Sequence, residues 1–393
     1  MRTSPLPPGA NVAALRKERG LSQARLARLA NVSLSLLSKV EVGDRTLTHA
    51  TAAVLARAMG VPLSEVLGRS RVAPSGDQCL AALRSAMRDY DVPGGQRVED
   101  ARIAVDVRTV AGHRDAFRVS ELLVMLPGLL RDATTRAHLV NTAGAWMDLV
   151  EVYSAVYWLA ARHRWTDMAE LAVTLQRWAV EQRPNLLGAA VAARDRAGAY
   201  LNGGDYEGGL ALVDRAVVEA ESRLSGDERA FAVGVLNLRG MTLAGRLADK
   251  RDGRREAERH IAAAGRASAE LGADRTRHSM LFGPANTTTH VLATRLDLGR
   301  PREALAMADD VDTALAALTP TRVAATKVNL ARAQVDTGDR DGALESLSTA
   351  WDAAPQMAVL NPMGREVLRV VSSLHQRSNP RLQRLCELAG LAP

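Results

Sequence analysis

The apolar positions near the start of the chain follow the period of short amphipathic helices. Within residues 22–41, SQARLARLANVSLSLLSKVE, the apolar faces consist of Leu26, Ala27 and Ala30 in a first run and Leu37 and Val40 in a second. Ser22 and Ser33 precede these runs and suit the N-cap position, where a hydroxyl accepts a hydrogen bond from a backbone N–H. Asn31 tolerates the left-handed backbone that ends a helix. The pattern predicts two short helices joined by a tight turn, a helix-turn-helix.

The flanking pattern adds three more short helices. Residues 12–20, VAALRKERG, form a basic amphipathic stretch that ends at a glycine. After Gly43, helical patterns cover about Thr48 to Met59 and a short stretch near residues 64–67, with Gly60 between them. Because each stretch is bounded by a helix-stopping glycine or a capping residue, five small helices are predicted in about sixty residues.

These five helices together resemble the phage-repressor (Cro/C1, or XRE) family of DNA-binding domains over residues 11–68. Asn31 stands where the family usually has glycine, and Leu47 replaces a common proline; we expect neither change to alter the fold. The resemblance implies an all-α, five-helix lambda-repressor-like domain whose partner is double-stranded DNA. The matching positions are Leu15, Arg16, Gly20, Leu21, Ser22, Gln23, Leu26, Ala27, Val32, Ser33, Leu37, Ser38, Lys39, Glu41, Gly43, Arg45, Leu55 and Ala56.

The second helix of the motif, Ser33 to about Val42, is the expected recognition helix, which enters the DNA major groove. By family resemblance, the residues expected at base edges are Leu34, Ser35 and Lys39. Ser38 is expected nearer the DNA backbone. Because leucine has no hydrogen-bond donor, Leu34 and Leu36 pack either on thymine methyls and sugar carbons or on protein, and shape readout contributes to specificity. The residues suited to phosphate contact are Gln23, Ser33 and Arg45.

The length and composition indicate a multidomain protein. A chain of 393 residues is longer than a single hydrophobic core usually accommodates, so two or more domains are expected. The longest apolar runs, such as 122–126, are too short to span a bilayer, and no basic-then-apolar leader opens the chain, so we expect a cytoplasmic location. Cys79 and Cys386 form no CxxC pair, which argues against disulfides and zinc. Abundant Ala and Arg with few Lys point to a GC-rich, actinobacterial type of genome.

The positive charge is concentrated at the N-terminal end of the chain. Residues 1–72 hold eleven Lys and Arg against four Asp and Glu, and the remainder holds forty of each kind. The whole net charge of +7 therefore lies on the candidate DNA-binding domain. Phosphate neutralisation requires such an excess, although surplus arginines also serve solubility in small domains.

From about residue 79 onward the pattern is helix after helix, and strand-like alternation is nearly absent. Five turns are each followed by a helix with a small residue near its start, at Ala169, Gly209, Ala257, Ala304 and Ala343. These positions are 40, 48, 47 and 39 residues apart. Helix pairs with a period near forty predict an α-solenoid, in which the small residue lets the two helices of a pair cross closely. The turns resemble those of tetratricopeptide repeats, whose usual period is about 34.

These patterns predict four regions along the chain. They are a disordered lead-in at 1–10, the DNA-binding domain at 11–68, a polar linker at 69–78, and a tetratricopeptide-like helical repeat domain at 79–393. In the last region, single helices are expected at about 78–90, 96–111 and 114–132, and a final helix pair at 362–390.

The sequence holds no recognisable catalytic constellation. It lacks G-x-G-x-x-G, a P-loop, G-x-S-x-G and H-E-x-x-H, and no two of its eight histidines lie three or four residues apart. We therefore expect no enzymatic activity, no cofactor and no metal site.

The first helix of each repeat pair is expected to line a concave face that holds an effector. Counting back fourteen residues from each small residue reaches this helix, and the polar residues at or near these positions are Arg194, Asp195, Arg239, Asn286, His290, Asn329 and Arg332. Asn and Arg suit a peptide backbone or an anionic small ligand, but an ordinary solvated surface has the same composition. Trp146, Tyr153 and Tyr157 form one helical stripe, which is either core or the wall of a ligand pocket.

Together these features predict a sequence-specific transcriptional regulator whose repeat domain dimerises and binds a peptide or small-molecule effector. The layout is similar to bacterial quorum-sensing regulators that join this head to tetratricopeptide-like repeats. A homodimer would place two heads on two half-sites of one operator. The alternative is an interaction scaffold whose head tethers it weakly to DNA.

Overall fold

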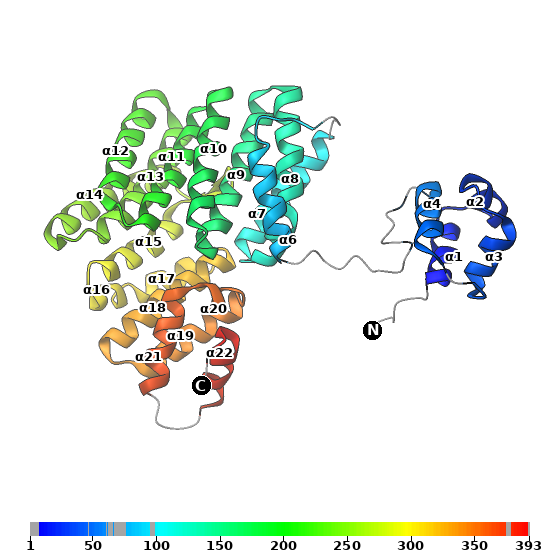
Figure 1. The fold of residues 1–393 in the computed structure, drawn as a ribbon. Helices are drawn as coiled ribbons and strands as arrows, with labels where there is room; N and C mark the ends of the chain where they lie inside the picture. Colours follow the sequence, from blue (N-terminus) through cyan, green and yellow to red (C-terminus); the bar gives the residue numbers. More distant parts are fainter. Residues whose placement is uncertain are drawn as a thin grey trace. The chain divides into compact units, whose positions relative to one another are not determined.

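The computed structural model divides the chain into two compact units, Met1–Gln78 and Cys79–Pro393, here termed the head and the body (Figure 1). The residues that the structure describes are 8–45, 47–59, 61, 66, 76–94, 99–374 and 379–391. The predicted stop at Gly60, nearly all of the helix near 64–67 and most of the linker at 69–78 lie outside these ranges.

The described part of the head is helical. Its helices are α1 (Pro8–Glu18), α2 (Gln23–Leu29), α3 (Leu34–Val42) and α4 (His49–Met59). Leu26, Leu37 and Leu55, from three of these helices, are fully buried and form the centre of its core. This core confirms the helical spacing that the sequence predicts for α2 and α3.

The predicted caps hold the two helices of the motif in place. Ser22 accepts a hydrogen bond from the Arg25 backbone N–H at 3.2 Å, and Ser33 accepts one from Leu36 at 3.1 Å. Asn31, in the turn, has the left-handed backbone expected of it, with φ of 52°. These contacts fix the angle at which α3 leaves the turn.

The predicted lead-in is too long, because α1 already begins at Pro8. Proline suits the first turn of a helix, where its missing N–H has no intrahelical acceptor. Gly9 lets α1 approach α3: a Cβ added at Gly9 would lie 1.9 Å from the Val40 carbonyl oxygen. Proline and glycine, which suggest disorder in the sequence, here begin a packed helix.

The body is an array of antiparallel helix pairs (Figure 1). The first helices of successive pairs are α7 (Asp100–Asp115), α9 (Ala143–His163), α11 (Leu186–Gly203), α13 (Gly226–Gly245), α15 (Pro284–Asp297) and α18 (Pro320–Thr337). Their partners are α8 (Val119–Val140), α10 (Thr166–Gln182), α12 (Tyr206–Arg223), α14 (Lys250–Leu271), the broken helix α16 (Pro301–Leu305) with α17 (Ala308–Leu315), and α19 (Arg340–Ala353). Flanking helices are α6 (Gly76–Arg88), α20 (Met357–Leu360), α21 (Pro362–Leu374) and α22 (Pro380–Ala389).

The small residues that define the repeat are buried at the crossing points of the helices. All five lie near the start of the second helix of a pair, and their positions are Ala169, Gly209, Ala257, Ala304 and Ala343. A Cβ added at Gly209 would lie 2.8 Å from Leu243 Cδ2, so no side chain fits there without displacing a neighbour. The solenoid predicted from this spacing is confirmed. The period exceeds 34 because most of these helices have 17 to 22 residues.

The array curves back until its ends meet. Each first helix packs against the next, in the order α7, α9, α11, α13, α15 and α18, and α18 also packs against α7. Thr321 Oγ1 donates a hydrogen bond to the Arg114 carbonyl oxygen at 2.6 Å across this closure. One hydrophobic cluster accordingly contains residues from both the beginning and the end of the body. The six first helices therefore surround a common region.

A short β-hairpin interrupts the helical array, although the sequence predicts almost no strand. Strand β1 (Arg275–Arg277) pairs antiparallel with β2 (Met280–Phe282), and the turn residues His278 and Ser279 both have positive φ. The turn sequence His-Ser replaces the Asn-Gly that usually marks such a hairpin, which is why the pattern does not reveal it. Both turn side chains bond to Glu151 of α9, through His278 Nδ1 at 3.0 Å and Ser279 Oγ at 2.8 Å.

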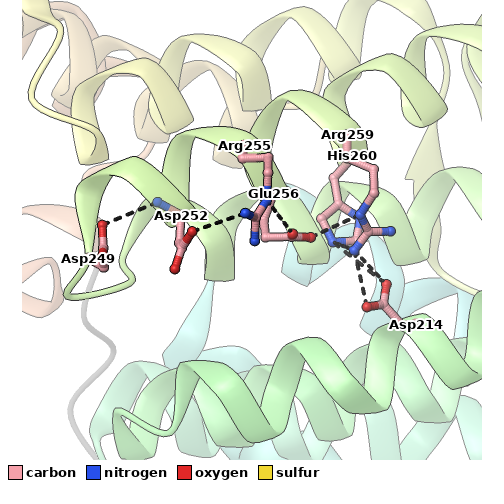
Figure 2. Close-up of polar contacts among 7 residues, drawn as sticks. All are labelled: Asp214, Asp249, Asp252, Arg255, Glu256, Arg259 and His260. Carbon is pink, nitrogen blue, oxygen red and sulfur yellow. Dashed lines mark hydrogen bonds and ion pairs between the residues drawn. The ribbon is translucent and has the colours of Figure 1, made fainter.

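A buried histidine joins α14 to α13. Figure 2 shows His260 beside Arg259 and Asp214. Arg259 lies 3.1 Å from His260 Nε2 and can only donate, so Nδ1 carries the proton and donates to Asn237 Oδ1 at 2.7 Å. Burial, together with the positive charge of Arg259, lowers the pKa of His260 to about 4. The imidazole is therefore neutral in the folded protein at neutral pH.

The neutral state of His260 makes the body less stable in acid. The unfolded chain takes up this proton below its ordinary pKa of 6.5, whereas the folded chain resists protonation until about pH 4. The stability should therefore fall between pH 6.5 and 4, with about 3 kcal/mol as the upper limit for this group. Urea titrations of wild type and His260→Gln across this window measure the difference. Equal pH slopes for the two proteins would refute the assignment.

Within the described residues, no helix combines the length and apolar character needed to cross a membrane. Among the same residues, no group of three or more His, Cys, Asp or Glu side chains is arranged to hold a metal ion.

Candidate nucleic-acid interface and effector site

Helix α3 presents a polar and apolar strip outward from the head. Leu34 is 49% exposed, and the side chains of Ser35 and Lys39 are exposed as well. Leu36 and Ser38 are half-buried, while Leu37 and Val40 face the core. The division between inward and outward positions agrees with the expected recognition helix. An exposed Leu34 is available for contact outside the head.

A buried ion pair fixes α3 against α1. Arg16 Nε donates to Glu41 Oε1 at 2.7 Å and Nη2 donates to Oε2 at 2.9 Å, while Nη1 donates to the Leu21 carbonyl at 2.8 Å. Burial opposes the charge of Glu41, but the hydrogen bonds from Arg16 and Gln23 outweigh it and lower the pKa of Glu41. The hydrogen bond to Glu41 correspondingly raises the pKa of Arg16. The pair sets the orientation in which α3 presents its outer face.

The residues predicted to contact phosphates lie around α3, and they differ in which hydrogen-bond donors remain available. Gln23 Nε2 donates to Glu41 Oε2 at 2.8 Å, so only its second amide hydrogen is left for a phosphate. The Ser33 oxygen accepts the capping bond, and its hydroxyl hydrogen stays available as a donor. Arg45 is exposed, and its backbone N–H donates to the Lys39 carbonyl at 3.1 Å, which holds the loop against the end of α3.

Residues 12–66 match the family model Helix-turn-helix. They form an XRE-type helix-turn-helix domain. The match begins within α1 and covers α2, α3, α4 and the turn between α2 and α3. No curated protein matches the chain.

Several solved structures are similar to the chain at low sequence identity. One is PlcR of Bacillus thuringiensis in complex with the peptide PapR7 and DNA, with 14% identity over 67% of this chain and 95% of that chain, and a TM-score of 0.29. Two others are the PrgX/cCF10 complex, with 11% identity over 88% of this chain and 93% of that chain, and PrgX alone, with 11% identity over 93% and 99%. Their TM-scores are 0.23 and 0.22.

Five of the predicted effector residues lie together on the first helices of the body, and they are Tyr157, Arg194, Asp195, Arg239 and His290. Asp195 is fully buried and accepts hydrogen bonds from Arg194 at 2.8 Å and Ser154 at 2.6 Å. Gly198 leaves the room that this group needs, because an added Cβ would lie 2.1 Å from the Tyr157 hydroxyl and 3.0 Å from Arg239 Nη2.

The other predicted effector residues are buried or half-buried, and three of them form hydrogen bonds or ion pairs with neighbouring residues. Trp146 and Tyr153 belong to the core, where the Trp146 indole N–H donates to Asn141 at 2.9 Å. Tyr157, the third residue of the aromatic stripe, is buried in the same cluster. The remaining three are Asn286, which donates to the Leu281 carbonyl at 2.7 Å, Arg332, which pairs with Asp297 at 2.9 Å, and the half-buried Asn329.

Three further arginines of the same region were not predicted from the sequence, namely Arg114, Arg162 and Arg322. Two of them lie seven residues from positions that the fourteen-residue count reaches: Arg162 follows Ala155, and Arg322 precedes Asn329. Seven residues are nearly two helical turns, so a search along the whole face would have found both. Arg114 lies in α7, before the first of the five turns recognised in the sequence, and only the closure of the array brings it to this region.

Proposed function

We propose that the chain is a transcriptional regulator that binds duplex DNA through α3 of the helix-turn-helix domain and senses an effector with its body. The main support for this proposal is the set of exposed side chains on α3, which the buried pair of Arg16 and Glu41 holds in a fixed orientation. The charge excess of residues 1–72 supports contact with phosphates. A protein of this kind works by binding, in the cytoplasm where bacterial DNA lies, and needs no catalytic group.

The roles on the DNA follow from the chemistry of each side chain. Ser35 and Lys39 carry donors that reach base edges in the major groove, and Ser38 lies closer to the sugar-phosphate backbone. Leu34 contributes apolar contact with a thymine methyl group, and Leu36 supports it from its half-buried position. Gln23, Ser33 and Arg45 position the domain through phosphates without reading sequence.

The proposed regulator acts as a homodimer on two half-sites, since one small domain buries limited surface on DNA. An effector, a peptide or small molecule, binds among the first helices of the body. Because these helices pack in one closed run, a change at the site alters the curvature of the array and the spacing of the two heads. The effector shifts this equilibrium only by its difference in affinity for the two forms.

Lys39→Ala tests the DNA-binding part of this proposal. Removing one cation at the interface should weaken binding several-fold and lower the slope of log affinity against log salt concentration by about one. Fluorescence anisotropy on duplex DNA, repeated at several salt concentrations, measures both quantities. Lys327→Ala is the matched control, because Lys327 pairs with Asp312 in the body. An unchanged affinity and slope for Lys39→Ala would exclude this residue from the interface.

A further inference from the structure

Each of the six first helices of the body contributes one basic side chain to a common region. These residues are Arg114 of α7, Arg162 of α9, Arg194 of α11, Arg239 of α13, His290 of α15 and Arg322 of α18. We term the five arginines the arginine cluster. Because α18 packs back against α7, the cluster is brought together by helices about two hundred residues apart in sequence.

Several contacts locate the cluster independently of its charge. The guanidinium carbons of Arg162 and Arg114 lie 4.0 and 6.0 Å from the centre of the Trp158 ring. Arg239 Nη2 and the Tyr157 hydroxyl meet at the space that Gly198 leaves open. The residue before Arg322 bonds to the Arg114 backbone.

Negative charge in this region is too small to balance the arginines. Asp195, paired with Arg194, is the carboxylate hydrogen-bonded within the cluster, and Asp115 and Glu151 act on Arg114 from outside it. Counting all three still leaves two positive charges in excess. In the described part of the chain, the other four arginines form no ion pair within 4.0 Å, and two buried nitrogens, Arg114 Nη1 and Arg239 Nε, have no hydrogen-bond partner.

This excess is unfavourable in the free protein. Burial and the neighbouring arginines lower the pKa of Arg239 and Arg322 to about 10, and burial lowers that of Arg162 to about 9. At neutral pH all three stay protonated, so the folded body holds uncompensated charges on half-buried side chains. Burial, together with the charges of Arg322, Arg194 and Arg239, lowers the pKa of His290 well below its usual value and keeps it neutral. A bound anion would remove this cost and satisfy the free N–H groups.

We propose that the arginine cluster binds a small polyanion, a molecule with phosphate groups or several carboxylates close together, and that this molecule is the effector. The inference rests on the proposed sensing function of the body and names the chemistry of its ligand. A peptide backbone needs donors and acceptors spread along a groove, whereas five guanidiniums gathered at one place match a compact group with at least two negative charges.

Calorimetry and thermal unfolding of the full chain test this inference, with inorganic pyrophosphate and citrate as probes at constant ionic strength. Wild type should bind at least one probe saturably and unfold at higher temperature in its presence. Binding of pyrophosphate alone assigns phosphate chemistry, and binding of citrate alone assigns carboxylates. Arg239→Gln and Arg322→Gln should each weaken binding by about tenfold, the loss expected for one charged hydrogen-bonding partner. Arg369→Gln, which affects an exposed pair with Glu366, should bind like wild type.

The unfolding temperature of the variants without any probe gives a second test. If these arginines stabilised the fold, replacing them would lower that temperature. Because each change removes an uncompensated charge from a half-buried position, Arg239→Gln and Arg322→Gln should unfold at the same or a higher temperature than wild type without any probe. Failure of both probes to bind, variants that bind like wild type, or free variants that unfold at lower temperature would each overturn the inference. The salt-dependence test with Lys39→Ala reports on DNA binding separately, so the inference can fail while the regulator stands. Anion binding that leaves DNA affinity unchanged would reject the effector role.

Discussion

Replacing Glu41 by glutamine should destabilise the helix-turn-helix domain by about 3 kcal/mol, because it leaves the Arg16 charge buried without its partner. The Arg16 and Glu41 side chains are only 10% and 4% exposed, so water cannot take the place of the carboxylate. The lowered pKa of Glu41 has the same origin, and the stability that it contributes is lost as the pH falls through that lowered value. Hydrogen exchange of the α1 to α3 amides in the full chain should accelerate roughly a hundredfold where it proceeds through unfolding of this domain.

A matched substitution at an exposed ion pair serves as the control, because it removes the same charge from a position that is not buried. Glu366→Gln removes the same carboxylate from an exposed pair with Arg369, where the side chains are 61% and 55% exposed. This variant should change local exchange by less than about 0.5 kcal/mol. Equal effects of the two variants, or unchanged exchange in α3 of Glu41→Gln, would show that the buried pair does not orient the recognition helix.

Ser35→Glu should lower the affinity for duplex DNA by about a hundredfold or more while the domain stays folded. Ser35 is exposed in the first turn of α3, where a carboxylate is favourable for the helix itself. On DNA the same carboxylate meets phosphates and acceptor-rich base edges, and such like-charge contact costs several kcal/mol. Anisotropy titrations at one salt concentration measure the loss, and circular dichroism verifies the fold.

Ser373→Glu adds an identical charge at an exposed position of α21 and serves as the control for net charge. Its affinity should change by no more than about twofold, as expected for a charge outside the interface. If Ser35→Glu bound DNA like this control, the outer face of α3 would not contact the DNA.

The head could be predicted from its sequence because its structure follows from local rules. The spacing of Leu26, Leu37 and Val40 gives the buried faces, and Ser22 and Ser33 give the caps. The exposed side of α3 follows from the same spacing. The error at Pro8 and Gly9 has a non-local cause, since the glycine is needed for contact with α3 across the domain.

In the body, only the features that depend on local sequence could be predicted. Helix pairs and the buried small residues could be predicted, and counting from those residues located Arg194, Asp195 and His290. The hairpin could not, because its strands have three residues each and its turn lacks glycine. Arg114 and Arg322 come together only because the array closes on itself, and no pattern within a single repeat records that closure.

The full chain can be used to select bound sequences from a random duplex library. A sequence-specific regulator should enrich a two-fold-related site with half-sites about one helical turn apart, and Ser35→Glu should lose this enrichment. Diffuse, fully salt-sensitive binding with no enriched sequence would contradict a sequence-specific regulator and favour a scaffold with a weak DNA tether.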